Sequence, residues 1–81
     1  MHHTNTISLL ELSVNNSATI AALKNGTAEA NRLVALGFTP GTEVSMAQNY
    51  GFGPLIVSVR GTRVALGRVE AAKILVERKI L

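Results

Sequence analysis

Few side chains in this 81-residue chain could perform acid–base or nucleophilic chemistry, and their spacing does not bring them together. The two histidines, His2 and His3, stand at the polar beginning of the chain, and the five glutamates are scattered along it. A hydrolase needs a positioned base with a second polar group within hydrogen-bond reach, and no such set can be assembled here. Ser45 and Ser58 fall on the outward side of predicted strands, where hydroxyl groups are ordinary. We therefore expect a protein that is not an enzyme.

The sequence also argues against a tight metal site or a phosphate loop. Transition metals prefer imidazole, thiolate or clustered carboxylates, but the chain has no cysteine and no two acids at ligand spacing. The segment 51–54, Gly-Phe-Gly-Pro, lacks the glycine spacing and the following helix of a phosphate loop. A free amino terminus with His3 could chelate copper or nickel, which we interpret as accidental. We expect no cofactor and no metal site in the folded body.

Composition favours one small soluble domain. At this length folding buries only about 60–65% of the surface of the unfolded chain, so the core is small. No apolar run approaches the ~20 residues of a membrane span, and no charged-then-apolar leader opens the chain. The absence of cysteine is compatible with a reducing compartment. We expect a disordered end over residues 1–6, a single domain over residues 7–78 and a tail over residues 79–81.

The charge pattern gives only weak support to nucleic-acid binding. The net charge is +3, from eight Lys or Arg and five Glu. A nucleic-acid surface usually clusters its basic residues on one face with aromatic residues between them. The nearest approach here is Arg60, Arg63 and Arg68, with Lys73 further on and no aromatic residue interleaved. We interpret these residues as solvated charges on the rim of the fold.

The central stretch, residues 33–44, reads as the end of a helix that turns sharply into a strand. Gly37 ends the helix, because a left-handed residue just past a helix end avoids a steric penalty when it is glycine. The aromatic residue after it is expected to pack back on Leu33. A Pro-Gly pair then supplies the two central residues of a type II turn. The structural turn therefore consists of Gly37, Phe38, Pro40 and Gly41.

Short segments with alternating apolar residues surround this turn and predict an all-β fold. One helix is expected over residues 28–36, with Thr27 as its cap and a buried stripe of Ala30, Leu33 and Val34. A helical turn with a capping box formed by Ser8 and Glu11 precedes the first strand, and a second brief turn covers residues 69–72. Five short strands and one inserted helix favour a small closed β-barrel, which removes exposed sheet edges. The predicted strands cover residues 18–23, 43–47, 55–60, 63–66 and 74–77, with a tight turn at Gly61 and Thr62.

Two surface features remain for recognition. Tyr50 and Phe52 lie among glycines in the predicted loop 49–54; they either fold over the mouth of the barrel or anchor a protein partner. Asn31 and Arg32 lie on the open side of the predicted helix, the second candidate surface. Together these four residues are the predicted partner-binding set.

Several motifs, taken in order, resemble the FeoA family of bacterial ferrous iron transport proteins. They are residues 8–12 (Ser-Leu-Leu-Glu-Leu), 32–44 (with Leu-Gly-Phe-Thr-Pro-Gly), 53–55 (Gly-Pro-Leu), 57–61 (Val-Ser-Val-Arg-Gly), 64–66 (Val-Ala-Leu) and 70–76 (Glu-Ala-Ala-Lys-Ile-Leu-Val). The resemblance implies an SH3-like barrel with an inserted helix. The chain departs from the common pattern at Asn15-Asn16, where a Pro-Gly-like turn is usual, and at Gly67, where a charged residue is frequent.

The resemblance also implies a function. FeoA-like proteins are cytoplasmic accessories of ferrous iron uptake, thought to act on a large membrane transporter that carries a GTP-binding domain. The same domain ends the chains of metal-dependent repressors. We therefore expect a cytoplasmic interaction module that does not itself span the membrane, whose partner is the membrane ferrous iron transporter. The rival hypothesis is a regulatory or nucleic-acid-binding small barrel.

Overall fold

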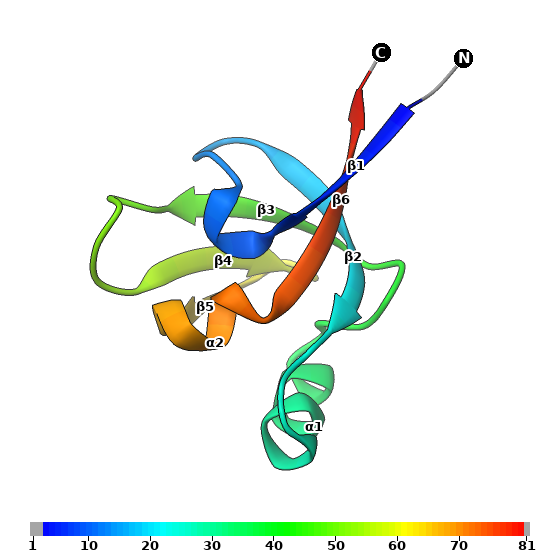
Figure 1. The fold of residues 1–81 in the computed structure, drawn as a ribbon. Helices are drawn as coiled ribbons and strands as arrows, with labels where there is room; N and C mark the ends of the chain where they lie inside the picture. The colour runs from blue at the N-terminus through cyan, green and yellow to red at the C-terminus, as the bar shows by residue number, and fades with distance from the viewer. Residues whose placement is uncertain (1–2, 81) are drawn as a thin grey trace.

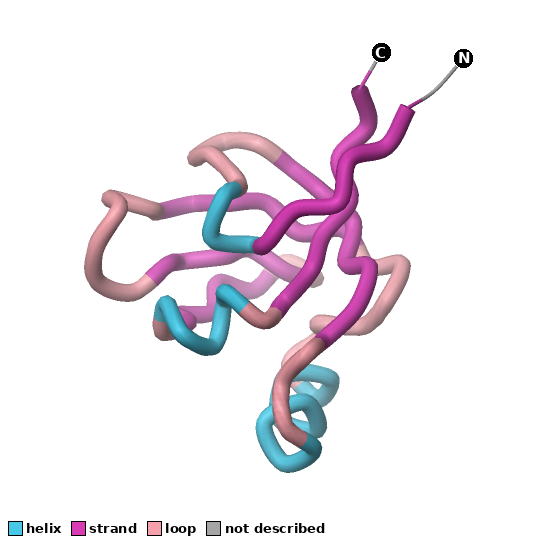
Figure 2. The backbone as a smooth tube through the Cα atoms, viewed as in Figure 1, coloured by secondary structure: helices cyan, strands magenta, loops and turns pink. Residues whose placement is uncertain are grey.

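The computed structural model describes residues 3–80, which form one strongly curved antiparallel sheet with helical segments at its periphery (Figures 1 and 2). The strand order is β1-β6-β2-β3-β4-β5. The elements are β1 (His3–Ser8), η1 (Leu9–Glu11), β2 (Ser17–Leu23), α1 (Thr27–Ala35), β3 (Glu43–Gln48), β4 (Leu55–Val59), β5 (Thr62–Leu66), α2 (Arg68–Ala72) and β6 (Ile74–Ile80). The predicted fold class, a small mostly-β barrel with one inserted helix, is confirmed.

We expected a closed barrel without exposed sheet edges. The sheet instead stays open, because its two end strands do not hydrogen-bond to each other. β1 and β5 stand at the two ends of the strand order and do not pair with each other. The chain continues from β1 directly into η1 and from β5 into α2, and these two helical segments pack together. Leu9 of η1 and Ala71 of α2 are both fully buried. Short helical segments, rather than a strand ladder, therefore close this side of the core.

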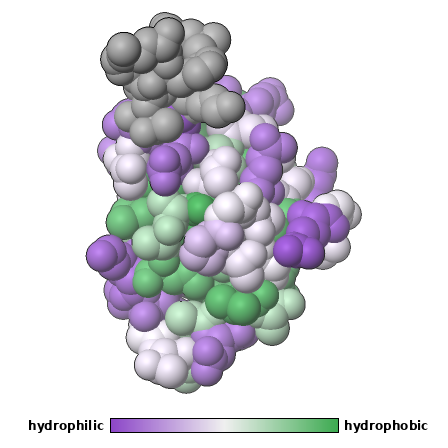
Figure 3. Space-filling view, turned by 90° about the vertical axis from the view of Figure 1, so that its right-hand side faces the viewer, coloured by the Kyte–Doolittle hydropathy of each residue, from purple (hydrophilic) through white to green (hydrophobic). Residues whose placement is uncertain are grey.

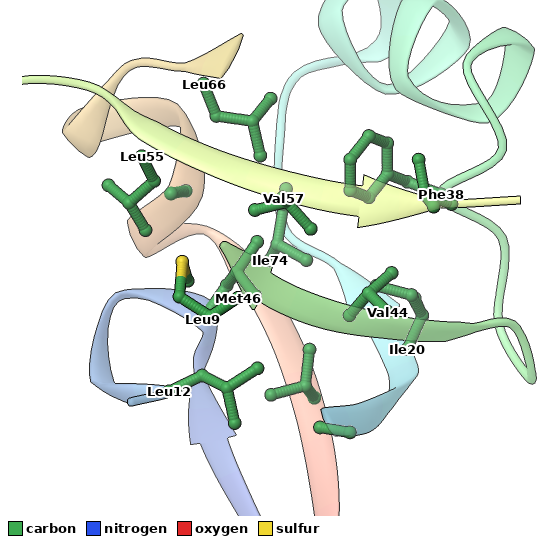
Figure 4. Close-up of a cluster of buried hydrophobic side chains, with 14 of the residues drawn as sticks. Leu9, Leu12, Ile20, Phe38, Val44, Met46, Leu55, Val57, Leu66 and Ile74 are labelled. Carbon is green, nitrogen blue, oxygen red and sulfur yellow. The ribbon is translucent and has the colours of Figure 1, made fainter. Parts of the chain in front are cut away.

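The core is entirely apolar among the described residues. Figure 4 shows its side chains converging from the strands, from η1 and from Phe38. The inward alternation predicted for β3 and β4 is confirmed, because each second residue of these strands is buried. The stripe predicted for α1 is partly wrong, since Leu33 is buried but Val34 is 45% exposed. The core residues are Leu9, Leu12, Ala18, Ile20, Leu33, Phe38, Val44, Met46, Leu55, Val57, Val59, Leu66, Ala71, Ile74 and Val76.

Strand β1 was not predicted. The sequence indicated a disordered end over residues 1–6, but residues 3–8 pair along β6 in the register from His3–Ile80 to Ser8–Leu75. The same pairing carries β6 to Ile80, so residues 79 and 80 extend the last strand instead of forming a separate tail. These polar residues show no apolar alternation, so the sequence does not indicate a strand here. The strand exists because backbone pairing with β6 stabilises it. Residues 1, 2 and 81 lie outside the described residues.

Three smaller differences concern turns and helix ends. The cap of α1 is Gly26 without a side-chain hydrogen bond, and Thr27 is the first helical residue. The β4–β5 hairpin turns at Arg60 and Gly61, with φ of 51° and 78°, and Thr62 already pairs with Val59. These positive angles match a type I′ turn, which suits the twist of two-residue hairpins. Residues 68–72 form a true α-helix, α2, where only a brief turn was expected.

The central turn has the predicted geometry. The N–H of Phe38 donates to the carbonyl of Leu33 at 2.9 Å, and the N–H of Gly37 donates to that of Val34 at 3.0 Å. This pair of bonds is the Schellman ending of a helix, and it requires the positive φ of 109° that Gly37 adopts. Gly41 has a φ of 91°, and the N–H of Thr42 donates to the carbonyl of Thr39, as a type II turn requires. The turn aims Phe38 into the core.

Candidate interaction surface

The acidic side chains are dispersed over the part of the chain that the structure describes. No group of three or more His, Asp or Glu could jointly hold a metal ion among the side chains of residues 5–78. Glu11 completes the capping box with Ser8, as predicted, and accepts from the Ser8 N–H at 3.2 Å. Glu70 is engaged by Arg32. These glutamates therefore have structural contacts, and the site must be sought on the surface.

Two aromatic side chains project from the loop between β3 and β4. Tyr50 is 69% exposed and Phe52 is 74% exposed, so neither covers the core. Their ring centroids lie 6.4 Å apart at an interplanar angle of 39°, within the range of an aromatic pair. The reading in which this loop folds over the mouth of the barrel is therefore wrong. The partner-binding reading of Tyr50 and Phe52 stays a prediction.

The loop is held in place by one amide side chain. The Nδ2 group of Asn49 donates to the carbonyl of Leu10 at 3.0 Å, which ties the loop to η1. Its Oδ1 atom accepts from the N–H of Gly51 at 3.2 Å and from an Arg68 Nη1 group at 3.2 Å. Asn49 therefore links three segments that are distant in sequence. The aromatic pair therefore projects from a loop that is held in place.

Arg68, the first residue of α2, adds a second fastening. Its Nη1 group reaches the carbonyl of Gly53 at 3.4 Å as well as Asn49. The aromatic platform, as we define it here, therefore consists of Tyr50 and Phe52, held by Asn49 and Arg68.

The second predicted surface, on α1, is partly engaged within the molecule. Asn31 and Arg32 are exposed, as expected. However, an Arg32 Nη2 group forms an ion pair with Glu70 of α2, although the Arg32 side chain remains 52% exposed. Asn25, just before α1, also donates to the carbonyl of Glu70 at 3.2 Å. Arg32 therefore helps to fasten α1 to α2.

The structure does not bring the two predicted surfaces together. The β3–β4 loop and α1 lie at different ends of the molecule (Figure 1). In the side view of Figure 3, hydrophobic residues gather in the middle of the face, and hydrophilic and neutral residues surround them. The four predicted partner-binding residues therefore form two separate surfaces.

The three arginines do not form one basic face either. The β3–β4 loop and the β4–β5 hairpin lie at opposite ends of β4, so Arg68 at the loop is distant from Arg60 at the hairpin. Arg60 instead lies over Gly37, at the end of α1. This arrangement weakens the rival nucleic-acid hypothesis, because a nucleic-acid footprint needs adjacent cations.

Sequence reasoning missed the residues that support the aromatic platform. Asn49 was read only as a loop former, although an asparagine at the end of a strand often bonds backbone groups. Arg68 was grouped with other basic residues because sequence alone does not show that α2 faces the β3–β4 loop.

Comparison with known proteins agrees with this architecture. The model of the FeoA domain family matches residues 7–78. A relative from Methanocaldococcus jannaschii that is named for Fe(2+) transport is 38% identical over 52 residues, and the match spans 64% of this chain and 62% of that protein. The chain therefore spans less than two thirds of that relative.

Solved structures show the same fold. A crystal structure of an iron uptake regulatory protein, FeoA, gives a TM-score of 0.84 at 29% identity, covering 94% of this chain and 100% of that one. The zinc complex of FeoA from Stenotrophomonas maltophilia is described as a prokaryotic SH3 domain protein. It gives a TM-score of 0.79 at 34% identity, covering 89% of this chain and 95% of that one. A manganese-dependent transcriptional repressor shares the fold alone, with a TM-score of 0.80 at 17% identity over 91% of this chain and 42% of that one.

No helix within residues 3–80 is both long and apolar enough to cross a membrane. The family match covers most of the described barrel, including the central turn, the β4–β5 hairpin and α2. The chain therefore belongs to the FeoA domain family.

Proposed function

We propose that this protein is a non-enzymatic, cytoplasmic accessory of ferrous iron uptake that binds a membrane ferrous iron transporter with a GTP-binding domain. Family membership and the names of the matched relatives support the link to iron. The dispersed acids and the wholly apolar core support a binding role over a catalytic one. We also propose that the folded body holds no cofactor or metal of its own.

The aromatic platform is the observation that carries this proposal. Tyr50 and Phe52 stay exposed although Asn49 and Arg68 hold their loop in place. Aromatic residues dominate interface energies, and a fixed loop loses little conformational entropy when a partner binds. The platform is therefore the proposed primary contact, and the exposed side of α1 with Asn31 and Arg32 is a proposed secondary contact.

Capture of the transporter from detergent-solubilised bacterial membranes tests the proposal. The immobilised protein should retain the transporter, and Phe52→Ala should weaken its capture at least about fivefold, a typical effect for an interface anchor. The matched control is Val14→Ala, which truncates an exposed apolar side chain that belongs to neither proposed contact. Equal capture by the wild-type protein and Phe52→Ala would remove the platform from the proposal, and no capture at all would reject the partner.

The rival hypothesis, a nucleic-acid-binding or regulatory barrel, predicts a different result. Arg60 and Arg63 are exposed near one hairpin, and no ion pair engages them among the side chains of residues 5–78. Binding of duplex DNA would fall steeply with salt, because bound counterions are released. We expect no salt-sensitive DNA binding, measured by fluorescence anisotropy at low and moderate ionic strength.

A further inference from the structure

A groove of about 710 Å³ opens where β2 and β6 separate, away from the aromatic platform. The ladder between these strands ends at the pair Thr19–Glu77. Beyond that pair β2 continues with β3 alone, and β6 continues with β1 alone. The two strands diverge as a V in Figure 1, where β2 begins and where β1 and β6 project together. One backbone edge of each strand therefore faces the groove instead of another strand.

Arg78 lies on the inner side of this groove. It is two residues beyond the buried Val76, so both side chains leave the same face of β6. The Arg78 Nε atom is buried and has no hydrogen-bond partner among the residues that the structure describes. A buried N–H group without an acceptor is costly, which favours a shift of the Arg78 side chain that uncovers Nε toward the groove. A carboxylate in the groove can then accept from Nε and a terminal nitrogen of the guanidinium together. The inner side is therefore suited to a carboxylate.

Two carboxylates lie on the outer side. Thr19 pairs with Glu43 on one side and with Glu77 on the other, so the two acids flank it on the same outward face of the sheet. Both acids are exposed, and neither forms an ion pair with another side chain of residues 5–78. The outer side is therefore suited to a cationic group, and the groove has opposite charge preferences on its two sides.

We propose that this groove binds an extended peptide segment of a partner protein, in which an acidic residue is directly adjacent to a basic one. An extended segment can hydrogen-bond to free strand edges, as in other cases of strand addition. Successive side chains of a strand point to opposite faces, so adjacent acidic and basic residues reach opposite sides of the sheet. The acid then meets Arg78, and the base meets Glu43 and Glu77.

Spacing is the distinctive feature of this proposal. An acid and a base separated by one residue would project to the same side, and one of them would meet a like charge. The volume suits a few residues of peptide, since ligand sites in proteins typically enclose about 300–1,000 Å³. The groove is independent of the proposed transporter contact, because it is lined by Asn16 and by residues of β2, β3 and β6 and not by the platform.

Titration of the full, ¹⁵N-labelled chain with two capped peptides tests the proposal. The peptide Val-Thr-Glu-Lys-Thr-Val has adjacent charges, and the peptide Val-Glu-Thr-Lys-Thr-Val has the same composition with the charges separated. We expect the first to bind at least about tenfold more tightly, as charge-assisted hydrogen bonds allow. Its amide shift changes should centre on residues 16–19, 43 and 77–78.

Variants identify the groups that recognise the charges. Arg78→Gln should weaken the adjacent-charge peptide at least about tenfold, and the matched control Arg63→Gln removes an equal charge elsewhere without effect. If the amide spectrum of Arg78→Gln shows that this variant does not fold, Glu43→Gln provides the test, because Glu43 is exposed. This second variant should reduce the preference for the peptide with adjacent charges. Equal affinity for the two peptides, shift changes outside the groove, or no binding at millimolar peptide would each overturn the proposal.

Discussion

The Cδ atom of Arg60 lies 3.0 Å from the position that a β-carbon on Gly37 would occupy. The Cγ2 atom of Val59 lies 3.2 Å from the same position. The end of α1 and the turn of the β4–β5 hairpin therefore meet at a residue without a side chain. Gly37 satisfies two demands at once, the left-handed backbone of the helix ending and the close approach of the hairpin.

Gly37→Val should lower the free energy of unfolding by at least about 2 kcal/mol. A β-branched residue is disfavoured at positive φ, and its side chain would also overlap Arg60 and Val59. The control, Ala35→Ser on the exposed side of α1, should cost less than about 0.5 kcal/mol. Denaturant midpoints measure both. Equal shifts for the two variants would show that the helix ending does not constrain the fold.

The ion pair between Arg32 and Glu70 should contribute little to stability. The Arg32 side chain is 52% exposed and the Glu70 side chain is 13% exposed, so solvent reaches the pair from the Arg32 side and screens the attraction. Ion pairs at the surface typically contribute up to about 1 kcal/mol. A double-mutant cycle with Arg32→Ala and Glu70→Ala should give a coupling energy below that value, decreasing as salt is added. A larger, salt-insensitive coupling would mean that the link between α1 and α2 is effectively buried.

Asn49→Ala should destabilise the protein more than truncation of either exposed aromatic residue. The change leaves the Leu10 carbonyl and one Arg68 hydrogen bond without their partner, and such losses typically cost about 1–3 kcal/mol. The matched control is Asn31→Ala, because Asn31 is an exposed asparagine on α1. Thermal melting measures both variants. A neutral Asn49→Ala would show that the loop does not depend on its amide bonds.

Sequence reasoning identified the features that depend on local chemistry. The helix ending at Gly37, the turn at Gly41 and the capping box of Ser8 with Glu11 follow from residue types at fixed spacing. Alternation also placed the buried residues of β3 and β4 correctly. These features need only neighbouring residues, so a single sequence contains the information.

The missed features depend on long-range pairing. β1 lacks an apolar alternation and exists as a strand through its register with β6, about 70 residues later. Val34 continues the helical stripe in sequence, but α1 projects from the barrel and leaves this side uncovered (Figure 1). Asn49 and Arg68 meet only because the fold places α2 beside the β3–β4 loop. Candidate surfaces were thus predictable, whereas the contacts that support them were not.

Ferrous ion should bind the folded body only weakly. Among the side chains of residues 5–78 no three acidic or histidine groups converge, and isolated carboxylates bind a divalent transition metal poorly. In the chain with His2→Ala and His3→Ala, an anaerobic calorimetric titration should show no saturable Fe(II) binding tighter than about micromolar. Copper provides the control, because copper binding that is lost in the substituted chain would show that His2 and His3 supply the ligands. Stoichiometric, tight iron binding in the substituted chain would contradict the prediction and would require ligands supplied by a second copy of the protein.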